Sequence, residues 1–259
     1  GDGLVADVRR SECQVLVTDA EHRELLDGLD LGDVRVLDTS SQEWAELLAG
    51  AGELVPHREV EMMDTFMMIF TSGTSGDPKA VQVAHLMVLF SGLNLVSRFE
   101  VTTDDVCYLS MPLFHSNAIM AGWAPALAVG ATIALAPRFS ASGFLPDVRR
   151  YGATYANYVG KPLAYVMATP EQPDDADNPL RLVFGNEANE RDIEGFGRRF
   201  GCTVIDSYSS TENAVIVQRV PEMPTGSLGR PVEGVAVLDP ATAEPTPDAI
   251  FDDDGRLLN

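Results

Sequence analysis

Short apolar runs alternate with amphipathic stretches along most of the chain. The amphipathic stretches predict helices that begin after a capping residue at Ser41, cover residues 85–97, and cover residues 191–200, where the apolar side chains share one face. The apolar runs predict buried strands at residues 13–19, 34–38, 65–72, 80–84, 106–110, 132–135, 153–159, 180–184 and 203–206. This alternation predicts an α/β fold of layered, largely parallel sheets flanked by helices.

The pattern changes after residue 213, where short strands with Pro and Gly turns replace the alternation. We therefore predict an α/β core over residues 1–213 and the start of a smaller β-rich subdomain over residues 214–259. Residues 1–10 have the pattern of a helix with no strand before it, and residues 251–259 that of a turn entering an unpartnered strand. We expect the core to be truncated at its N-terminus.

The chain is strongly acidic. Its 259 residues include 39 Asp and Glu against 18 Lys and Arg, a formal net charge of −21. Nucleic acids and anionic lipid headgroups need a basic surface, so this charge excludes them as main partners. Cys13, Cys107 and Cys202 lack the spacing of a zinc site or a disulfide framework, and no signal-peptide pattern opens the chain. These features predict a reducing, cytoplasmic location.

One uncharged stretch, residues 118–137, is long enough to be considered as a membrane span. Gly122, Pro125 and Gly130 interrupt it, and its second half has the pattern of a short strand after a helix. We therefore predict a buried helix and strand there, and at most peripheral contact with a membrane.

Residues 70–81 (FTSGTSGDPKAV) form a Ser/Thr/Gly loop between two apolar strands, and this loop ends in Lys79. Glycines let successive backbone N–H groups face an anion, hydroxyls add donors, and lysine adds positive charge, so the loop predicts a phosphate site. It is neither a Walker A loop nor a nucleophile elbow, because the Gly-Lys-Ser/Thr and Gly-x-Ser-x-Gly patterns are missing. The alternative is an ordinary glycine-rich turn.

Four segments, in a fixed order, are similar to a known superfamily. Residues 71–79 resemble the AMP-binding signature of the adenylate-forming enzymes, which include the acyl-CoA synthetases. Residues 111–118 (MPLFHSNA), 184–188 (FGNEA) and 206–213 (DSYSSTEN) resemble three further segments of that superfamily. The four matches span about half of the chain and are far more specific together than one loop.

Two other segments narrow the resemblance to one branch of the superfamily. Residues 158–165 (YVGKPLAY) and 196–201 (FGRRFG) are similar to the fatty-acid transport proteins and very-long-chain acyl-CoA synthetases. The resemblance implies the N-terminal domain of an adenylate-forming enzyme as the fold, in incomplete form.

The resemblance implies a two-step reaction, that of an ATP-dependent fatty acyl-CoA synthetase. A carboxylate attacks the α-phosphorus of ATP, expels pyrophosphate and forms an acyl-adenylate, from which the thiol of coenzyme A then displaces AMP. The implied small-molecule partners are a fatty acid, ATP and coenzyme A, and the implied metal is Mg²⁺. The oligomeric state stays open.

The same resemblance implies roles for individual residues. Lys79, His115, Thr211 and Glu212 are the implied catalytic residues: Lys79 ends the phosphate loop, His115 lies near the acyl carboxylate, Thr211 donates to the α-phosphate, and Glu212 helps to bind Mg²⁺. Tyr208 is implied to lie against the adenine ring. The remaining implied nucleotide contacts are Thr71, Ser72, Gly73, Thr74, Ser75, Gly76, Gly185, Asn186, Glu187, Ala188, Asp206, Ser207, Ser209 and Ser210.

Some residues depart from the family pattern. Ser75 stands where the family has Thr, and Ser209 stands where it has Gly, which puts a side chain close to the expected adenine site. The Tyr-x-Thr-Gly-Asp segment, the Gly-Arg-x-Lys hinge and the C-terminal catalytic domain are absent from this sequence. Structural roles are the alternatives at two positions: His115 as a packed histidine, and Glu212 as a carboxylate at a helix N-terminus.

Three functions remain open from the sequence. The first is a fatty acyl-CoA ligase. The second is an adenylating ligase for another acid or acceptor, such as a carnitine-type or aryl acid or a carrier-protein thiol. The third is a nucleotide- or acyl-binding module without turnover, which the absent C-terminal domain and Ser209 favour.

Overall fold

A computed structural model describes residues 1–71, 79–212, 215–219, 227–247, 250, 252 and 258. The chain divides into two compact units, residues 1–85 and residues 86–259. The division that we predict at residues 213 and 214 stays a prediction, because both residues lie outside the described ranges.

The first unit contains two small sheets. One is a parallel pair, β1 (Val15–Thr18) and β2 (Arg35–Asp38), accompanied by α1 (Asp2–Arg10), a short 3₁₀ helix (Arg23–Leu26) and α2 (Gln42–Ala49). The other is an antiparallel hairpin of β3 (Thr65–Thr71) and β4 (Lys79–Ala84). The predicted cap of α2 is confirmed, because the Ser41 hydroxyl accepts a hydrogen bond from the backbone N–H of Trp44 at 3.1 Å.

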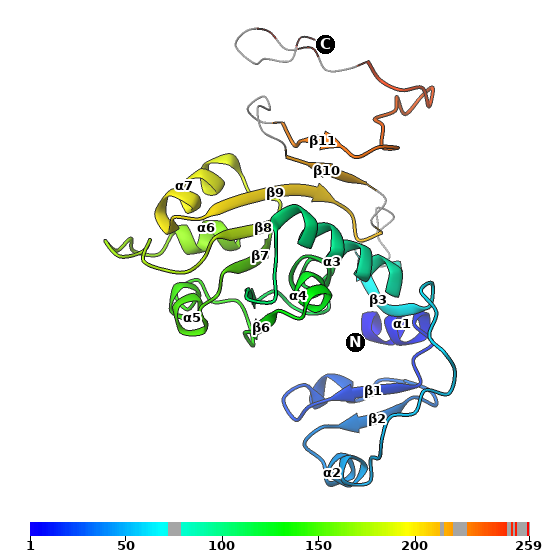
Figure 1. Cartoon of the computed structure of the whole chain (residues 1–259). Helices are drawn as coiled ribbons and strands as arrows, with labels where there is room; N and C mark the ends of the chain where they lie inside the picture. Colours follow the sequence, from blue (N-terminus) through cyan, green and yellow to red (C-terminus); the bar gives the residue numbers. More distant parts are fainter. Residues whose placement is uncertain are drawn as a thin grey trace. The chain divides into compact units, whose positions relative to one another are not determined.

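The second unit is built on a seven-stranded sheet in the order β11-β10-β9-β8-β7-β5-β6 (Figure 1). Five strands are parallel, as the sequence predicts: β5 (Val106–Leu109), β6 (Thr132–Leu135), β7 (Tyr155–Val159), β8 (Leu182–Asn186) and β9 (Thr203–Ser209). The antiparallel strands β10 (Ile216–Gln218) and β11 (Arg230–Pro231) extend this sheet beyond β9. Its helices are α3 (His85–Phe99), α4 (Ala124–Val129), α5 (Phe144–Tyr151), α6 (Pro162–Met167) and α7 (Glu190–Phe200).

Two apolar clusters lie on opposite faces of this sheet. Because successive side chains of a strand point to opposite faces, Tyr108 and Tyr158 pack in the cluster that contains α5, α6 and α7. Leu109 and Tyr155 pack in the cluster that contains α3 and α4. The central strands are therefore covered on both faces, which explains their continuous apolar sequence and fixes the position of their carboxyl ends.

The uncharged stretch of residues 118–137 forms a π-helical turn (Ala118–Trp123), then α4 and β6. This agrees with the predicted helix and strand. Within the part of the chain that the structure describes, none of the helices combines the length and the apolar character needed to span a bilayer. Cytoplasmic location and peripheral membrane contact stay predictions.

Candidate functional site

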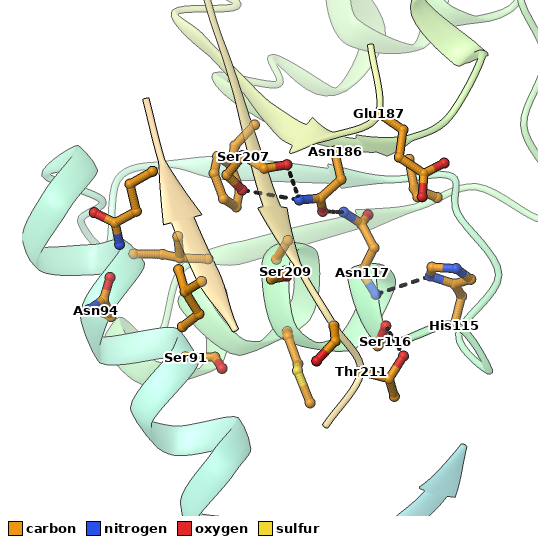
Figure 2. Close-up of a pocket in the computed structure, with 18 of the residues that line it drawn as sticks. Ser91, Asn94, His115, Ser116, Asn117, Asn186, Glu187, Ser207, Ser209 and Thr211 are labelled. Atoms are coloured by element: carbon orange, nitrogen blue, oxygen red, sulfur yellow. Dashed lines mark hydrogen bonds between the residues drawn. The ribbon is translucent and has the colours of Figure 1, made fainter. Parts of the chain in front are cut away.

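A pocket of about 270 Å³ lies in the second unit, where β7, β8 and β9 end (Figure 2). Carboxyl ends of parallel strands are a common place for ligands in α/β folds. One wall is α3, a second is the segment that follows β5, and a third is formed by the ends of the strands together with β10. The lining residues are Phe90, Ser91, Asn94, Leu95, Arg98, His115, Ser116, Asn117, Met120, Ala121, Val159, Phe184, Asn186, Glu187, Ser207, Ser209, Ser210, Thr211, Ile216 and Gln218.

Three of the four sequence segments meet at this pocket. Seven predicted site residues line it, namely His115, Asn186, Glu187, Ser207, Ser209, Ser210 and Thr211. Five others of the same segments do not line it, namely Gly185, Ala188, Asp206, Tyr208 and Glu212. The convergence of segments up to 95 residues apart is visible in one contact, in which the hydroxyls of Ser116 and Thr211 lie 3.2 Å apart.

The fourth segment belongs to the first unit. Thr71 and Lys79 lie opposite each other, at the end of the hairpin where the chain leaves β3 and returns into β4. The predicted phosphate contacts Ser72, Gly73, Thr74, Ser75 and Gly76 lie outside the described residues. The phosphate site therefore stays a prediction.

His115 is held in one orientation by its own segment. The backbone N–H of Asn117 donates a hydrogen bond to Nδ1 of His115 at 3.1 Å (Figure 2). Because Nδ1 accepts, the neutral ring carries its proton on Nε2. His115 is partly buried and lines the pocket, so its Nε2–H is a donor suited to a carboxylate or phosphate oxygen.

A chain of amide side chains joins the pocket segments. Asn117 donates through Nδ2 to the Tyr158 carbonyl at 2.8 Å and to Oδ1 of Asn186 at 3.2 Å, and its Oδ1 accepts from Asn157 at 2.6 Å. Asn186 in turn donates to the Ser207 carbonyl at 2.6 Å and to its hydroxyl at 3.0 Å. These hydrogen bonds fix the separation of β7, β8 and β9 beside His115 (Figure 2).

Asn117 and Asn157 were missed by sequence reasoning. The available signal was polarity within an apolar run, since Asn157 lies in the buried strand YANYV. Buried amides are retained where they make hydrogen bonds, and here those bonds order a site.

Two predicted nucleotide contacts have structural roles. Gly185 is buried, and a side chain on it would collide with Tyr158 of β7, so packing alone requires glycine there. Asp206 is 6% exposed and accepts hydrogen bonds from the Tyr158 hydroxyl at 2.6 Å and from the backbone N–H of Ala188 at 2.9 Å. Asp206 thus anchors the Gly185–Ala188 loop to β9.

Burial raises the pKa of Asp206, more strongly than the hydrogen bonds from Tyr158 and Ala188 lower it. A carboxyl whose folded-state pKa is raised destabilises the fold once it ionises, and this cost disappears as the pH falls through the folded-state pKa. We therefore expect that acidification from pH 7 toward pH 4 stabilises the chain relative to its Asp206→Asn variant. Urea unfolding of both proteins across this range measures the difference, and a difference that is constant or of opposite sign contradicts the assignment.

Glu187 has a left-handed backbone, with φ of 70°, and it lines the pocket. Residues other than glycine adopt this conformation at a cost of roughly 1–2 kcal/mol. Strain of this kind is typical of sites where the surrounding structure holds a side chain or loop in place for a ligand.

Arg98 is a further pocket residue that the sequence did not single out. It lies near the end of the largely apolar helix α3, where it is partly buried, and burial lowers its pKa. Its Nη2 donates a hydrogen bond to the Arg219 carbonyl at 3.0 Å. A charged residue on the lining face of an apolar helix was the signal available in the sequence.

Comparison with known proteins gives the class of protein. A family model for AMP-binding enzymes matches residues 3–257, so the chain belongs to the AMP-binding enzyme family. This confirms the superfamily that the four segments predict.

Individual relatives narrow the comparison. The chain is 50% identical, over 100% of its length, to a medium/long-chain-fatty-acid–CoA ligase of Mycobacterium tuberculosis, and covers 50% of it. It is 45% identical, again over 100% of its length, to the steroid-22-oyl-CoA synthetase of Rhodococcus jostii, and covers 48% of it. The chain thus spans about half the length of these relatives. The long-chain fatty acid transport protein 2 of Rattus norvegicus is 38% identical over 66% of this chain and 28% of its own length, which confirms the predicted similarity to that branch.

Solved structures confirm the fold. The chain superposes on a benzoate CoA ligase from Burkholderia xenovorans LB400 with a TM-score of 0.78 at 21% identity, covering 95% of this chain and 52% of that one. An O-succinylbenzoate coenzyme A synthetase from Bacillus subtilis, solved with ATP and magnesium ion, gives a TM-score of 0.71 at 24% identity and covers 100% of this chain and 50% of that one. The predicted α/β fold of an adenylate-forming enzyme is therefore correct.

Proposed function

We propose that this chain forms the nucleotide- and acyl-binding part of an ATP-dependent fatty acyl-CoA ligase. The observation that carries the proposal is the meeting of three family segments at one pocket, with the His115 ring, the Thr211 hydroxyl and the Asn186 amide on its walls. The similarity to a fatty-acid–CoA ligase, over the whole of this chain and half of that relative, supports the same function.

The lining residues suit adenylation because both reactants are anions. Attack of a carboxylate on the α-phosphorus of ATP needs charge neutralisation and alignment more than a strong base. In the proposed reaction the His115 Nε2–H donates to the acid carboxylate, and the Thr211 hydroxyl donates to the α-phosphate. Lys79 and the 72–76 segment hold the outer phosphates, and Tyr208, whose side chain is exposed, provides a surface for adenine.

The residues near Thr211 are compatible with an Mg²⁺ ion that is bound mainly by the phosphates of a nucleotide. Among the described residues no group of three or more His, Cys, Asp or Glu side chains is gathered as a metal site, and Glu212 is an exposed carboxylate next to Thr211. Mg²⁺ commonly uses one or two carboxylates and takes its other ligands from phosphates and water, so Glu212 alone suffices from the protein. When bound, the ion neutralises phosphate charge. Coenzyme A is the proposed acceptor of the acyl group.

A steroid acid is the second candidate for the acid substrate. The observation that favours it is the 45% identity to a steroid-22-oyl-CoA synthetase over the whole chain. Both candidates share the adenylation chemistry and differ only in what fills the pocket beyond the carboxylate.

The test is binding of non-hydrolysable acyl-adenylate analogues, in which a sulfamate replaces the phosphate. The 259-residue chain is titrated calorimetrically with a fatty-acyl analogue, a steroid-acyl analogue and AMP. We expect an acyl analogue to bind at least tenfold more tightly than AMP, because it occupies both parts of the site. Equal affinity for AMP and all analogues would mean that the pocket does not take an acyl group.

A further inference from the structure

The pocket has two chemically different polar ends. At one end lie His115 and the Ser116–Thr211 hydroxyl pair. At the other end lies Gln218, which pairs with Ser207 of β9, together with Arg98, which donates to the carbonyl of the next residue, Arg219. Ser207 and Thr211 are four positions apart, so the two ends are separated by up to about 13 Å of extended chain.

The wall between these ends is mixed. Its apolar part is formed by Leu95 of α3, Val159 and Phe184 of the sheet, Met120, and Ile216 of β10. Its polar part includes Asn186, Ser207 and Ser209. An extended acyl chain whose carboxylate lies at His115 would run along this wall toward Arg98. The end of the acid that is remote from its carboxylate would therefore lie beside the Arg98 guanidinium group and not beside apolar side chains alone.

Arg98 differs from three other arginines of this unit, each of which has a carboxylate partner. Arg199 is paired with Asp175 at 2.6 Å, Arg181 with Asp105 at 2.9 Å, and Arg219 with Glu190 at 3.0 Å. For Arg98, none of the carboxylates in the described ranges lies within ion-pair distance. Its guanidinium has five N–H donors, of which one is directed to the Arg219 carbonyl.

An arginine without a carboxylate partner is costly once water is excluded, unless an oxygen of the ligand accepts its hydrogen bonds. A plain alkyl chain would displace water from Arg98 and Gln218 without offering an acceptor for their hydrogen bonds. A carbonyl or carboxylate oxygen would restore the hydrogen bonds, and a carboxylate would also compensate the charge.

We propose that the acid bound here carries a second oxygen function, a carbonyl or a carboxylate, at the end remote from the carboxyl group that is activated; this inference rests on the proposed ligase function. Arg98 is the residue that selects the second oxygen function, with the Gln218 amide as a second donor. Asn94, one turn before Arg98 on the same helix, also lines this end of the pocket (Figure 2).

The test compares three acyl-adenylate analogues of equal chain length. The first ends in a methyl group, the second in a methyl ketone and the third in a carboxylate, and the last two distinguish the two sources of oxygen. Calorimetric titration of the 259-residue chain is expected to show that one of the two oxygenated analogues binds at least tenfold more tightly than the methyl-ended analogue. Arg98→Met, which keeps the length of the side chain but removes its donors, is expected to abolish this preference and to leave or improve binding of the methyl-ended analogue.

Arg191→Met is the matched control, because Arg191 is an exposed arginine outside the pocket. The Arg191→Met variant should prefer the oxygenated analogue as strongly as the unchanged chain does. Gln218→Leu gives a second test and should weaken the preference for the oxygenated analogue. This variant tests the inference even if Arg98→Met does not fold. Equal binding of all three analogues, or a preference that survives both substitutions, overturns the inference while the proposed function stands. If no analogue binds, the proposed function fails, and the inference fails with it.

Discussion

Replacing Arg199 by methionine is expected to lower the free energy of unfolding by roughly 3–5 kcal/mol, because the substitution leaves a buried carboxylate without its partner. Arg199 on α7 and Asp175 in the loop before β8 have side chains 5% and 4% exposed, and they are joined at 2.6 Å. Arg199 also donates to the carbonyls of Thr169 and Pro170, each at 3.0 Å. Urea unfolding followed by circular dichroism measures the loss.

The same loop offers a matched control. Arg149 contacts the Asp174 carboxylate at 3.1 Å, with side chains 36% and 63% exposed, and also donates to the carbonyls of Asp174 and Asp177. An exposed ion pair contributes about 0–1 kcal/mol. Arg149→Met should therefore cost far less than Arg199→Met. The double variant Arg199→Met, Asp175→Leu should recover part of the loss, because it removes both buried charges. Similar losses for both single variants would show that packing of the arginine stem, and not the buried charge, dominates.

The central parallel strands were predictable because they are buried on both faces. Tyr155–Val159 is an apolar run of this kind, whose period does not fit an amphipathic helix. The edge strand Thr132–Leu135 is exposed at both ends, and its short apolar run was still sufficient to predict a strand. The predicted helix at residues 191–200 is confirmed as well, with Ile193, Phe196 and Phe200 buried. In these segments the local pattern and the tertiary position agree, so the sequence alone is enough to predict the element.

Strand ends were less predictable, because their polar residues are satisfied by distant partners. The prediction ended β9 at Asp206, whereas the strand continues to Ser209. Asp206 and Ser207 look like turn residues locally, and they are accommodated because Tyr158 and Asn186 hydrogen-bond to them. Partners of this kind are not encoded in the spacing along the chain.

The residues of the candidate site also fall into two groups, those that the sequence could predict and those that it could not. Motif resemblance found His115 and Thr211, which line the pocket, since their segments carry recognisable patterns. Asn117 and Arg98 have no such pattern, and their importance depends on which carbonyls and side chains the fold brings to them. Asp175 lies in the acidic loop of residues 170–179, and its burial depends on Arg199, 24 positions later.

Thr211→Val is expected to reduce acid-dependent ATP–pyrophosphate exchange by about 10²–10³-fold, the typical effect of losing one donor that stabilises transition-state charge. Valine keeps the shape of threonine and removes its hydroxyl. The contact with Ser116 at 3.2 Å positions this hydroxyl at the pocket wall, so it is oriented before substrate binds. The exchange assay on the proposed ligase measures the effect, with the affinity for ATP measured in parallel.

Ser116→Ala separates orientation from donation. It removes the partner hydroxyl and leaves the Thr211 hydroxyl in place, so we expect a smaller loss, on the order of tenfold, from the loss of one hydrogen bond. Thr132→Val on β6, at the edge of the sheet and outside the pocket, is the control and should leave the exchange rate unchanged. If Thr211→Val changes the rate less than twofold while ATP still binds, the hydroxyl does not contact the reacting phosphate, and the contact with Ser116 serves only to hold the segment that follows β9 against the segment that follows β5.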